Sequence, residues 1–316
     1  MLSNLIFSLN ATVPILLMMV IGYILKRIKF IDTHTCAALN KLVFRVFLPA
    51  LLFLDLANQD FAGIWDSSFV LFCAVTTILS ILIALGCSVI MCRDMDDRGE
   101  FIQASFRSAA ATLGIAFMTN IYDNVAMVAL MIIGSVPIYN IVSVIVLSLT
   151  SPDNNTSNQP ILGRTLKNVI TNPIILSIFA GLIWSLLPLK MPFIMEKSIT
   201  YLGNVASPLA LIALGAAFEF KNLKEKCLPI IAVVFNKLVL FTALFLPLAI
   251  YMGFRDEKLV AALIMLGSGT TSSSFIMAKN MGHNGTISSS AVMTTTFLSS
   301  FTMTIWLFII RSLGYI

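Results

Sequence analysis

The sequence predicts an all-α integral membrane protein of ten transmembrane helices. The first observation is composition, since 58% of the 316 residues are hydrophobic and 11% are charged, whereas a soluble domain carries about 25% charged residues. The second is the mean hydropathy of +0.95. The third is a series of apolar runs, each of the roughly 17–25 residues that a helix needs to cross a bilayer. These runs leave no room for a separate soluble domain.

The expected spans follow one another along the whole chain and are separated by short connections rich in charged and turn-forming residues. They cover about 5–25, 36–57, 67–92, 101–121, 125–149, 165–187, 198–218, 228–252, 258–281 and 286–313. The fourth and the ninth span are the least typical, because both are rich in small and polar residues.

Lysine and arginine are divided unevenly between the two sets of alternate connections. The set that begins with the connection between the first two spans carries eleven of them, and the other set carries five. The positive-inside rule therefore places the first set in the cytoplasm and both termini outside. We expect a multi-pass protein of the plasma (inner) membrane in the lipid bilayer. The net charge of +5 then belongs to short loops and not to a nucleic-acid-binding surface.

An internal repeat is visible at an offset of 159 residues. Pro14 and Gly22 of the first span recur in the sixth span as Pro173 and Gly181, and the stretch that begins at Pro49 matches a stretch of the seventh span at the same offset. Each half then holds five spans. Because five is odd, the two halves must insert with opposite topology.

The predicted halves are residues 1–150 and 164–316, joined by a short cytoplasmic loop at 151–163. The fourth span of each half is the polar one, and the second of these contains 267–274, in which no side chain is larger than threonine. Such residues let backbones approach closely and can satisfy groups freed by a break in a helix. Tight helix packing alone would also explain them. Their matching position in both halves favours a transport site.

The candidate substrate-binding residues lie in these two spans and in two neighbouring ones. Arg107 is close enough to the cytoplasmic end either to snorkel or to contact substrate, and Asn140 either lines the site or bridges two helices. Lys237 lies roughly 15 Å into the eighth span, where a charge costs on the order of 2.5–3.5 kcal/mol and indicates function. Hydroxyls, backbone carbonyls or a substrate carboxylate could satisfy it. The full set is Arg107, Ala109, Thr112, Gly114, Ala116, Asn140, Lys237, Ser268, Gly269, Thr270, Thr271 and Ser272.

Several stretches, in order across nearly the whole chain, carry a family resemblance. They are 39–44, 47–53, 105–108, 113–114, 136–140, 171–173 with Gly181, 206–211 and 273–279. Together they resemble the auxin efflux carrier family in its prokaryotic branch, which includes malonate and malate permease-like proteins.

This resemblance implies ten helices in two inverted five-helix repeats, divided into a scaffold part and a transport part. It also implies that the interrupted helices four and nine cross near the midplane at the substrate site, and that transport uses an elevator-like movement. A homodimer is an expectation from the resemblance alone. The family often has an asparagine near Ala109 and prolines near Ala116 and Gly269, which this chain lacks. Because Ala116 does not favour a break, helix four is expected to be more continuous than usual.

We therefore expect a secondary transporter of a small organic anion, such as a mono- or dicarboxylate or an auxin-like weak acid. No ATP-binding motif is present, so transport is expected to be driven by substrate or ion gradients, with protons or sodium as candidate coupling ions, or to be facilitated diffusion. One alternative is a sodium-coupled organic anion symporter of the bile-acid type. Another is a non-transporting membrane receptor or scaffold, which short loops disfavour. An enzyme, a cofactor or a metal site is not expected, because no His, Asp or Cys constellation lies within the spans.

Overall fold

The computed structural model describes residues 2–57, 65–110, 118, 121–122, 126–152, 161–187, 191–218 and 226–316. All regular secondary structure in these ranges is helical, which confirms the predicted class. By length and composition, six segments of this part of the chain can cross a membrane. They are Thr33–Ala57, Ser67–Met91, Met127–Leu149, Phe193–Ala217, Cys227–Tyr251 and Thr286–Ser312.

The first two predicted spans correspond to one long helix and one helix with a widened segment. Helix α1 covers Leu2–Arg27. The second span begins with α2 (Thr33–Leu42), continues as the π-helix η1 (Val43–Phe47) and ends with α3 (Leu48–Ala57). Its start is set by Asp32, whose carboxylate accepts a hydrogen bond from the Thr35 amide at 2.6 Å, the usual arrangement at a helix N-cap.

The rest of the first half is built from three helices. Helix α4 (Ser67–Met91) begins at Asp66, which accepts hydrogen bonds from two main-chain amides of the first turn. Helix α5 covers Met95–Phe106 and helix α7 covers Ala126–Leu149. Helix α5 is only 12 residues long, so within the described residues the predicted fourth span is interrupted soon after it begins.

The second half departs from prediction at its start. The expected single span at 165–187 is two helices, α8 (Ile161–Ile170) and α9 (Pro173–Leu186). The prediction was wrong because Asn172 accepts a hydrogen bond from the Ile174 amide and Pro173 occupies the first helical position, so that a new helix begins there. Helix α10 follows at Phe193–Ala217.

The last three predicted spans contain one continuous helical segment, one broken helix and one long helix. The first is α12 (Cys227–Phe235), the π-helix η3 (Asn236–Leu240) and α13 (Phe241–Tyr251). The broken one is α14 (Asp256–Gly267) followed by α15 (Ser273–Asn280). The chain ends with α16 (Thr286–Ser312).

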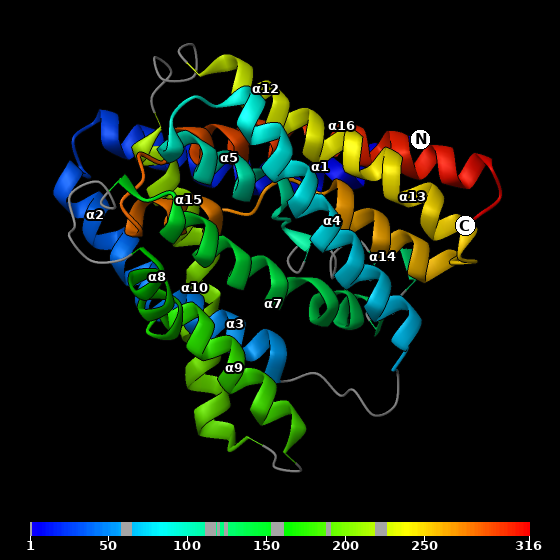
Figure 1. Cartoon of the computed structure of the whole chain (residues 1–316), viewed down its shortest axis with the longest axis horizontal. Helices are drawn as coiled ribbons and strands as arrows, with labels where there is room; N and C mark the ends of the chain where they lie inside the picture. Colours follow the sequence, from blue (N-terminus) through cyan, green and yellow to red (C-terminus); the bar gives the residue numbers. More distant parts are fainter. Residues whose placement is uncertain are drawn as a thin grey trace.

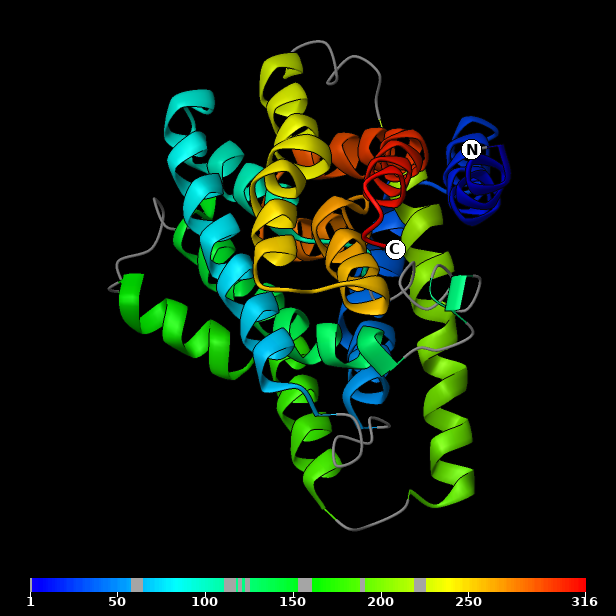
Figure 2. The same ribbon diagram turned by 90° about the vertical axis from the view of Figure 1, so that its right-hand side faces the viewer.

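The helices pack as two groups. In group one, α1 lies along α10, and α3 lies against both α9 and α10. In group two, α4 packs on α5 and α7, α13 packs on α14, and α16 contacts α5, α12, α14 and α15. Figure 1 shows α3, α9 and α10 extending together away from α4, α12 and α13, and Figure 2 shows α10 (yellow-green) apart from α4 (cyan). Contacts of α16 with α1 and of α15 with α10 join the groups.

Glycines allow the closest approaches within group one. A Cβ placed on Gly22 of α1 would lie 2.1 Å from the Ile212 carbonyl oxygen of α10, and one on Gly181 of α9 would lie 2.8 Å from the Phe53 carbonyl oxygen of α3. Only a residue without a side chain fits such contacts. The two contacts are related residue by residue through the offset of 159 that the sequence repeat predicts.

The connections that were predicted to share a side of the membrane meet in the structure. Lys226, before α12, forms an ion pair with Asp97 in the first turn of α5. From the opposite set of connections, Lys258 forms an ion pair with Asp66, just before α4. Each of these two ion pairs joins connections of one predicted set, while the grouping of the other connections and the set that faces the cytoplasm stay predictions.

Candidate functional site

The candidate site lies where two non-helical segments cross. Helix α5 ends at Phe106 and the chain continues in extended conformation at Arg107 (ψ 136°), while α14 ends at Gly267 and continues extended at Ser268 (ψ 156°). The segments are joined by a main-chain hydrogen bond of 2.9 Å from the Ala109 amide to the Gly269 carbonyl. The expectation of a more continuous helix four is therefore wrong at this point, since the helix stops before Ala109.

The small residues of the second segment bind it to its neighbours on two sides. The Thr270 amide donates to Thr295 Oγ1 of α16 at 2.9 Å, and Thr270 Oγ1 donates to the Ala104 carbonyl of α5 at 2.8 Å. A Cβ on Gly269 would lie 3.0 Å from the main chain of Thr296. Small side chains here permit the approach of two other helices, while the hydroxyls satisfy backbone groups that the break leaves free.

Arg107 is the charged residue at the crossing. Its guanidinium donates to Asn140 Oδ1 of α7 at 3.1 Å and to Ser273 Oγ of α15 at 2.6 Å, and it contacts the Met277 sulfur. The residue is 3% exposed, and its buried Nε has no acceptor within the part of the chain that the structure describes. All of these partners are uncharged, so Arg107 does not snorkel towards a helix end as one alternative required. Asn140 both bridges helices and faces the site.

A cavity of about 60 Å³ lies beside Arg107, between the two helix groups. Group one supplies side chains of α3 and Ser207 of α10, and group two supplies α7 and the residues that lead into α15. The described lining residues are Leu48, Leu51, Leu52, Asp55, Arg107, Ser108, Ala109, Val136, Tyr139, Asn140, Ser207, Thr271, Ser272 and Ser273. Asp55 and Tyr139 were not among the predicted residues. The acidic Asp55 was overlooked because it lies close to the end of its span.

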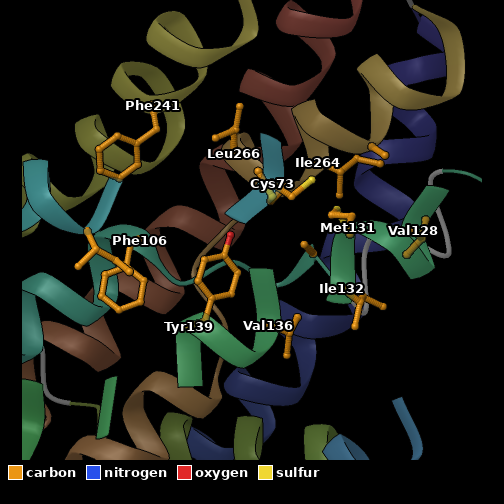
Figure 3. Close-up of a cluster of buried hydrophobic side chains, with 14 of the residues drawn as sticks. Cys73, Phe106, Val128, Met131, Ile132, Val136, Tyr139, Phe241, Ile264 and Leu266 are labelled. Carbon is orange, nitrogen blue, oxygen red and sulfur yellow. The ribbon is translucent and has the colours of Figure 1, made fainter. Parts of the chain in front are cut away.

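A cluster of buried apolar side chains packs next to the crossing. The rings of Phe106 and Tyr139 lie with centroids 6.0 Å apart, and Figure 3 shows them beside each other, with Cys73 and Leu266 close to the Tyr139 hydroxyl end. All four side chains are buried. Phe106, the last residue of α5, thus lies against Tyr139 of α7, directly before the extended segment begins.

Lys237 lies at another part of the same crossing. It belongs to η3, is 1% exposed, and is absent from the described lining of the 60 Å³ cavity. Its Nζ lies 3.5 Å from the Phe106 carbonyl oxygen and 3.4 Å from the Met265 carbonyl oxygen. Of the three alternatives that the sequence left open, backbone carbonyls are therefore the observed partners.

The other predicted residues divide into two sets. Ser268, Gly269 and Thr270 take part in the contacts between the crossing segments, while Thr271 and Ser272 line the cavity. Thr112, Gly114 and Ala116 lie outside the described residues.

Comparison with known proteins agrees with this geometry. The family described as "Membrane transport protein" matches residues 7–307. The chain belongs to this family, that of the auxin efflux carriers. Over 305 residues, 92% of each chain, it is 24% identical to a protein of Rhizobium meliloti (strain 1021) named "Putative malonate transporter". Over 302 residues it is 20% identical to an "Uncharacterized transporter" of Methanothermobacter thermautotrophicus, covering 95% of this chain and 97% of that one. The role of the family is transport, which is not an enzymatic one.

This membrane transport protein has a second, wider cavity, which is also lined by residues of α7 and α15. It measures about 770 Å³ and is lined by Arg45 of η1, Ser148 near the end of α7, Asn172 before α9 and Lys279 of α15. Ser148 follows Asn140 by eight residues, which is roughly 12 Å along a helix. The wide cavity thus lies further along α7 than the crossing, at the end where the connections carry most of the basic residues.

Three titratable side chains meet at the same end of this transport protein, within 4.8 Å of one another: Asp96, Glu100 and His283. His283 Nε2 faces the Leu147 carbonyl at 2.9 Å and Nδ1 forms an ion pair with Asp96 at 2.6 Å. Both Glu100 oxygens accept main-chain N–H groups, from Gly285 at 2.6 Å and from Ser288 at 2.8 Å.

The ring of His283 therefore has oxygen acceptors at both nitrogens. A histidine that binds a metal must offer an unprotonated nitrogen, so this geometry suits an imidazolium and not a metal ligand. Burial alone would lower the pKa of His283, but the Asp96 carboxylate, the Leu147 carbonyl and the Glu100 charge outweigh it and raise the pKa. The cluster joins α5, α7 and the connection between α15 and α16.

Proposed function

We propose that this protein is an elevator-type secondary transporter of a small mono- or dicarboxylate, with malonate the first candidate. The observation that carries the proposal is the buried guanidinium of Arg107, which lines a cavity at the crossing and whose hydrogen-bond partners among the described residues are uncharged. A buried charge without a counter-ion is costly and indicates function. A carboxylate of the substrate would supply the missing negative charge through charge-assisted hydrogen bonds.

A second feature supports an anionic substrate. Helix α15 begins at Ser273, and Thr271, Ser272 and Ser273 line the cavity. The N-terminal end of a helix carries a partial positive charge and free N–H groups, which favour anions. Arg107 and this helix end therefore bracket the same small volume.

The position of the cavity supports an elevator. Its lining comes from α3 and α10 of group one and, in group two, from the segment 107–109 that follows α5, from α7 and from the start of α15. We assign group one to the scaffold and group two to the moving part, so that sliding of one on the other carries the substrate. At about 60 Å³ the site is smaller than ordinary ligand pockets of ~300–1,000 Å³, and the 770 Å³ cavity beyond it is the access route from the basic side.

We further propose the ten-helix inverted repeat and its orientation, with both termini outside the plasma (inner) membrane. The paired glycine contacts of Gly22 with Ile212 and of Gly181 with Phe53 support the repeat, because a two-fold axis relating the halves would generate one from the other. Assembly as a homodimer is proposed on the family likeness alone.

Asp55 suggests the coupling ion. Its carboxyl group lines the same cavity as Arg107, so a substrate carboxylate would have to lie near another acid. Two neighbouring carboxylates favour uptake of a proton by one of them. We therefore propose proton-coupled transport, with the sodium-coupled bile-acid type as the second candidate, because backbone carbonyls at the crossing are suited to a cation.

The test is uptake of labelled malonate, malate, succinate, lactate and indole-3-acetate by proteoliposomes, comparing wild type with Arg107→Gln. Arg311→Gln is the matched control, since Arg311 is exposed near the C-terminus. Hydrogen bonds to charged groups contribute about 1.5–3 kcal/mol, so Arg107→Gln should raise the KM for the transported anion roughly 10- to 150-fold. Unchanged anion uptake by folded Arg107→Gln would refute the site. No flux from folded wild type would favour a receptor or scaffold.

A further inference from the structure

Lys237 is placed where two helices end. Phe106 is the last residue of α5, and Met265 lies two residues before the end of α14. The Nζ of Lys237 lies 3.5 Å from the first carbonyl oxygen and 3.4 Å from the second. Among the described residues these two carbonyls are its only hydrogen-bond acceptors. The ammonium group therefore faces the C-terminal ends of both half-helices at the crossing.

Such a place attracts a cation. The last carbonyls of a helix have no intrahelical partners and carry about half a negative charge. Two such ends converge here in a region shielded from water, since Lys237 is 1% exposed. In transporters with broken helices, half-helix carbonyls of this kind coordinate Na⁺ or H⁺ carriers. A lysine ammonium is a compact point charge with three donors, which resembles a small cation in its demands.

A third oxygen lies at the same helix end. Thr242, in the first turn of α13, is fully buried, and its Oγ1 has no hydrogen-bond partner among the described residues. This atom lies 3.0 Å from the position that a Cβ on Gly267, the last residue of α14, would take. The π-helical segment that carries Lys237 is itself of a kind found often at functional sites. The end of α14 therefore has an additional ligand oxygen that the protein does not otherwise use.

We infer that the Lys237 ammonium is a built-in cation that occupies the position of an alkali-metal coupling ion, so that transport needs neither Na⁺ nor K⁺. Removal of the side chain leaves a site for a small alkali cation formed by the carbonyls of Phe106 and Met265 and by Thr242 Oγ1. Lys237 is then a positioning residue that acts through the two helix ends and does not contact the substrate. The role of Lys237 in transport rests on the proposed function, whereas the cation site in the variant without the lysine side chain does not.

The first experiment needs no substrate. Thermal stability of detergent-purified protein is measured in NaCl, LiCl and choline chloride at equal ionic strength, for wild type, Lys237→Ala, Lys237→Met and the control Lys197→Ala, whose side chain is exposed. Wild type, Lys197→Ala and Lys237→Met, in which the methionine fills the space without a charge, should melt at the same temperature in all three salts. Lys237→Ala should melt lower in choline and regain stability in NaCl or LiCl, or with ethylammonium chloride, which replaces the missing group.

The second experiment measures uptake of the transported anion under a fixed proton gradient. Wild type should transport equally in Na⁺ and in choline, whereas Lys237→Ala should lose about ten- to hundredfold in choline and recover in Na⁺. A wild type that requires Na⁺ overturns the inference, as does a Lys237→Ala protein whose KM rises with no response to any cation. If Lys237→Ala does not fold in any salt, the inference is tested with Lys237→Met. Transport or stability of Lys237→Met that depends on the cation overturns the inference. Absence of flux from every protein would refute the proposed function and leave the thermal result standing.

Discussion

Gly269 is the residue at which the crossing has the least room. A Cβ added there would lie 3.0 Å from the Thr296 amide nitrogen and Cα and 3.2 Å from the Thr295 carbonyl carbon, all of them main-chain atoms of α16. Main chain cannot rotate away as a side chain can, so Gly269→Ala must move the segment or the helix by a few tenths of an ångström. Overpacking of this kind costs about 1–3 kcal/mol, which corresponds to roughly 5- to 150-fold in a rate.

The movement would act on the link between the two half-helices. The Gly269 carbonyl accepts the hydrogen bond from Ala109, and the next residue, Thr270, binds α16 and α5. We expect Gly269→Ala to insert and fold, but to transport at least fivefold more slowly, because the cavity is formed by these segments. The measurement is initial uptake per inserted protein in proteoliposomes, together with the melting temperature in detergent.

Gly86→Ala is the matched control. Gly86 is exposed on α4, and a Cβ there would meet no heavy atom within 4 Å, so this variant should transport like wild type. The reasoning is refuted if Gly269→Ala transports at the wild-type rate, or if Gly86→Ala loses as much activity as Gly269→Ala does.

Two further predictions concern titratable groups. Asp55→Asn should abolish the stimulation of anion uptake by a proton gradient while leaving downhill exchange of the anion intact, because the amide cannot carry a proton. Anion uptake is measured with and without the gradient. Stimulation that persists in the variant would exclude Asp55 as the proton carrier. Since the pKa of His283 is raised above its unfolded value of about 6.5, its stabilising effect is fully present below that pH and is lost as the pH rises through the folded pKa. The melting temperature of wild type should therefore fall from pH 6 to pH 9 by more than that of His283→Gln, and equal slopes would contradict the assigned imidazolium.

The sequence was sufficient for the helical class and for the two spans rich in small and polar residues, because both follow from composition, while the crossing of these spans was implied by the family resemblance. A run such as 267–274 cannot pack well against lipid, and its matching place in the two halves indicated a shared function. The single span predicted at 165–187 failed for the opposite reason. Hydropathy does not distinguish a helix from two helices in a row, and only the cap formed by Asn172 and Pro173 marks the boundary.

The charged residues were harder to assign, because their partners leave no trace in the sequence. The depth of Arg107 was counted along a helix that in fact ends at Phe106, so the guanidinium extends into the crossing and not towards a helix end. For Lys237 the sequence left hydroxyls, backbone carbonyls and a substrate carboxylate open, and the observed acceptors are main-chain carbonyls. Every residue has a carbonyl, and it becomes a ligand only where a helix stops.

The two buried positively charged side chains of the crossing, Arg107 and Lys237, lie at opposite kinds of helix end. Arg107 lies near the start of α15, which is a positive helix end. The guanidinium therefore adds to a positive potential that favours an anion. The N–H groups of that helix end cannot act as acceptors for the guanidinium. Near Lys237 lie the ends of α5 and α14, which are negative and which the ammonium satisfies. Since the described lining of the cavity includes Arg107 and not Lys237, only the arginine charge remains for a substrate. In the proposed transporter, this division assigns one positive charge of the crossing to the anion and the other to the helix ends.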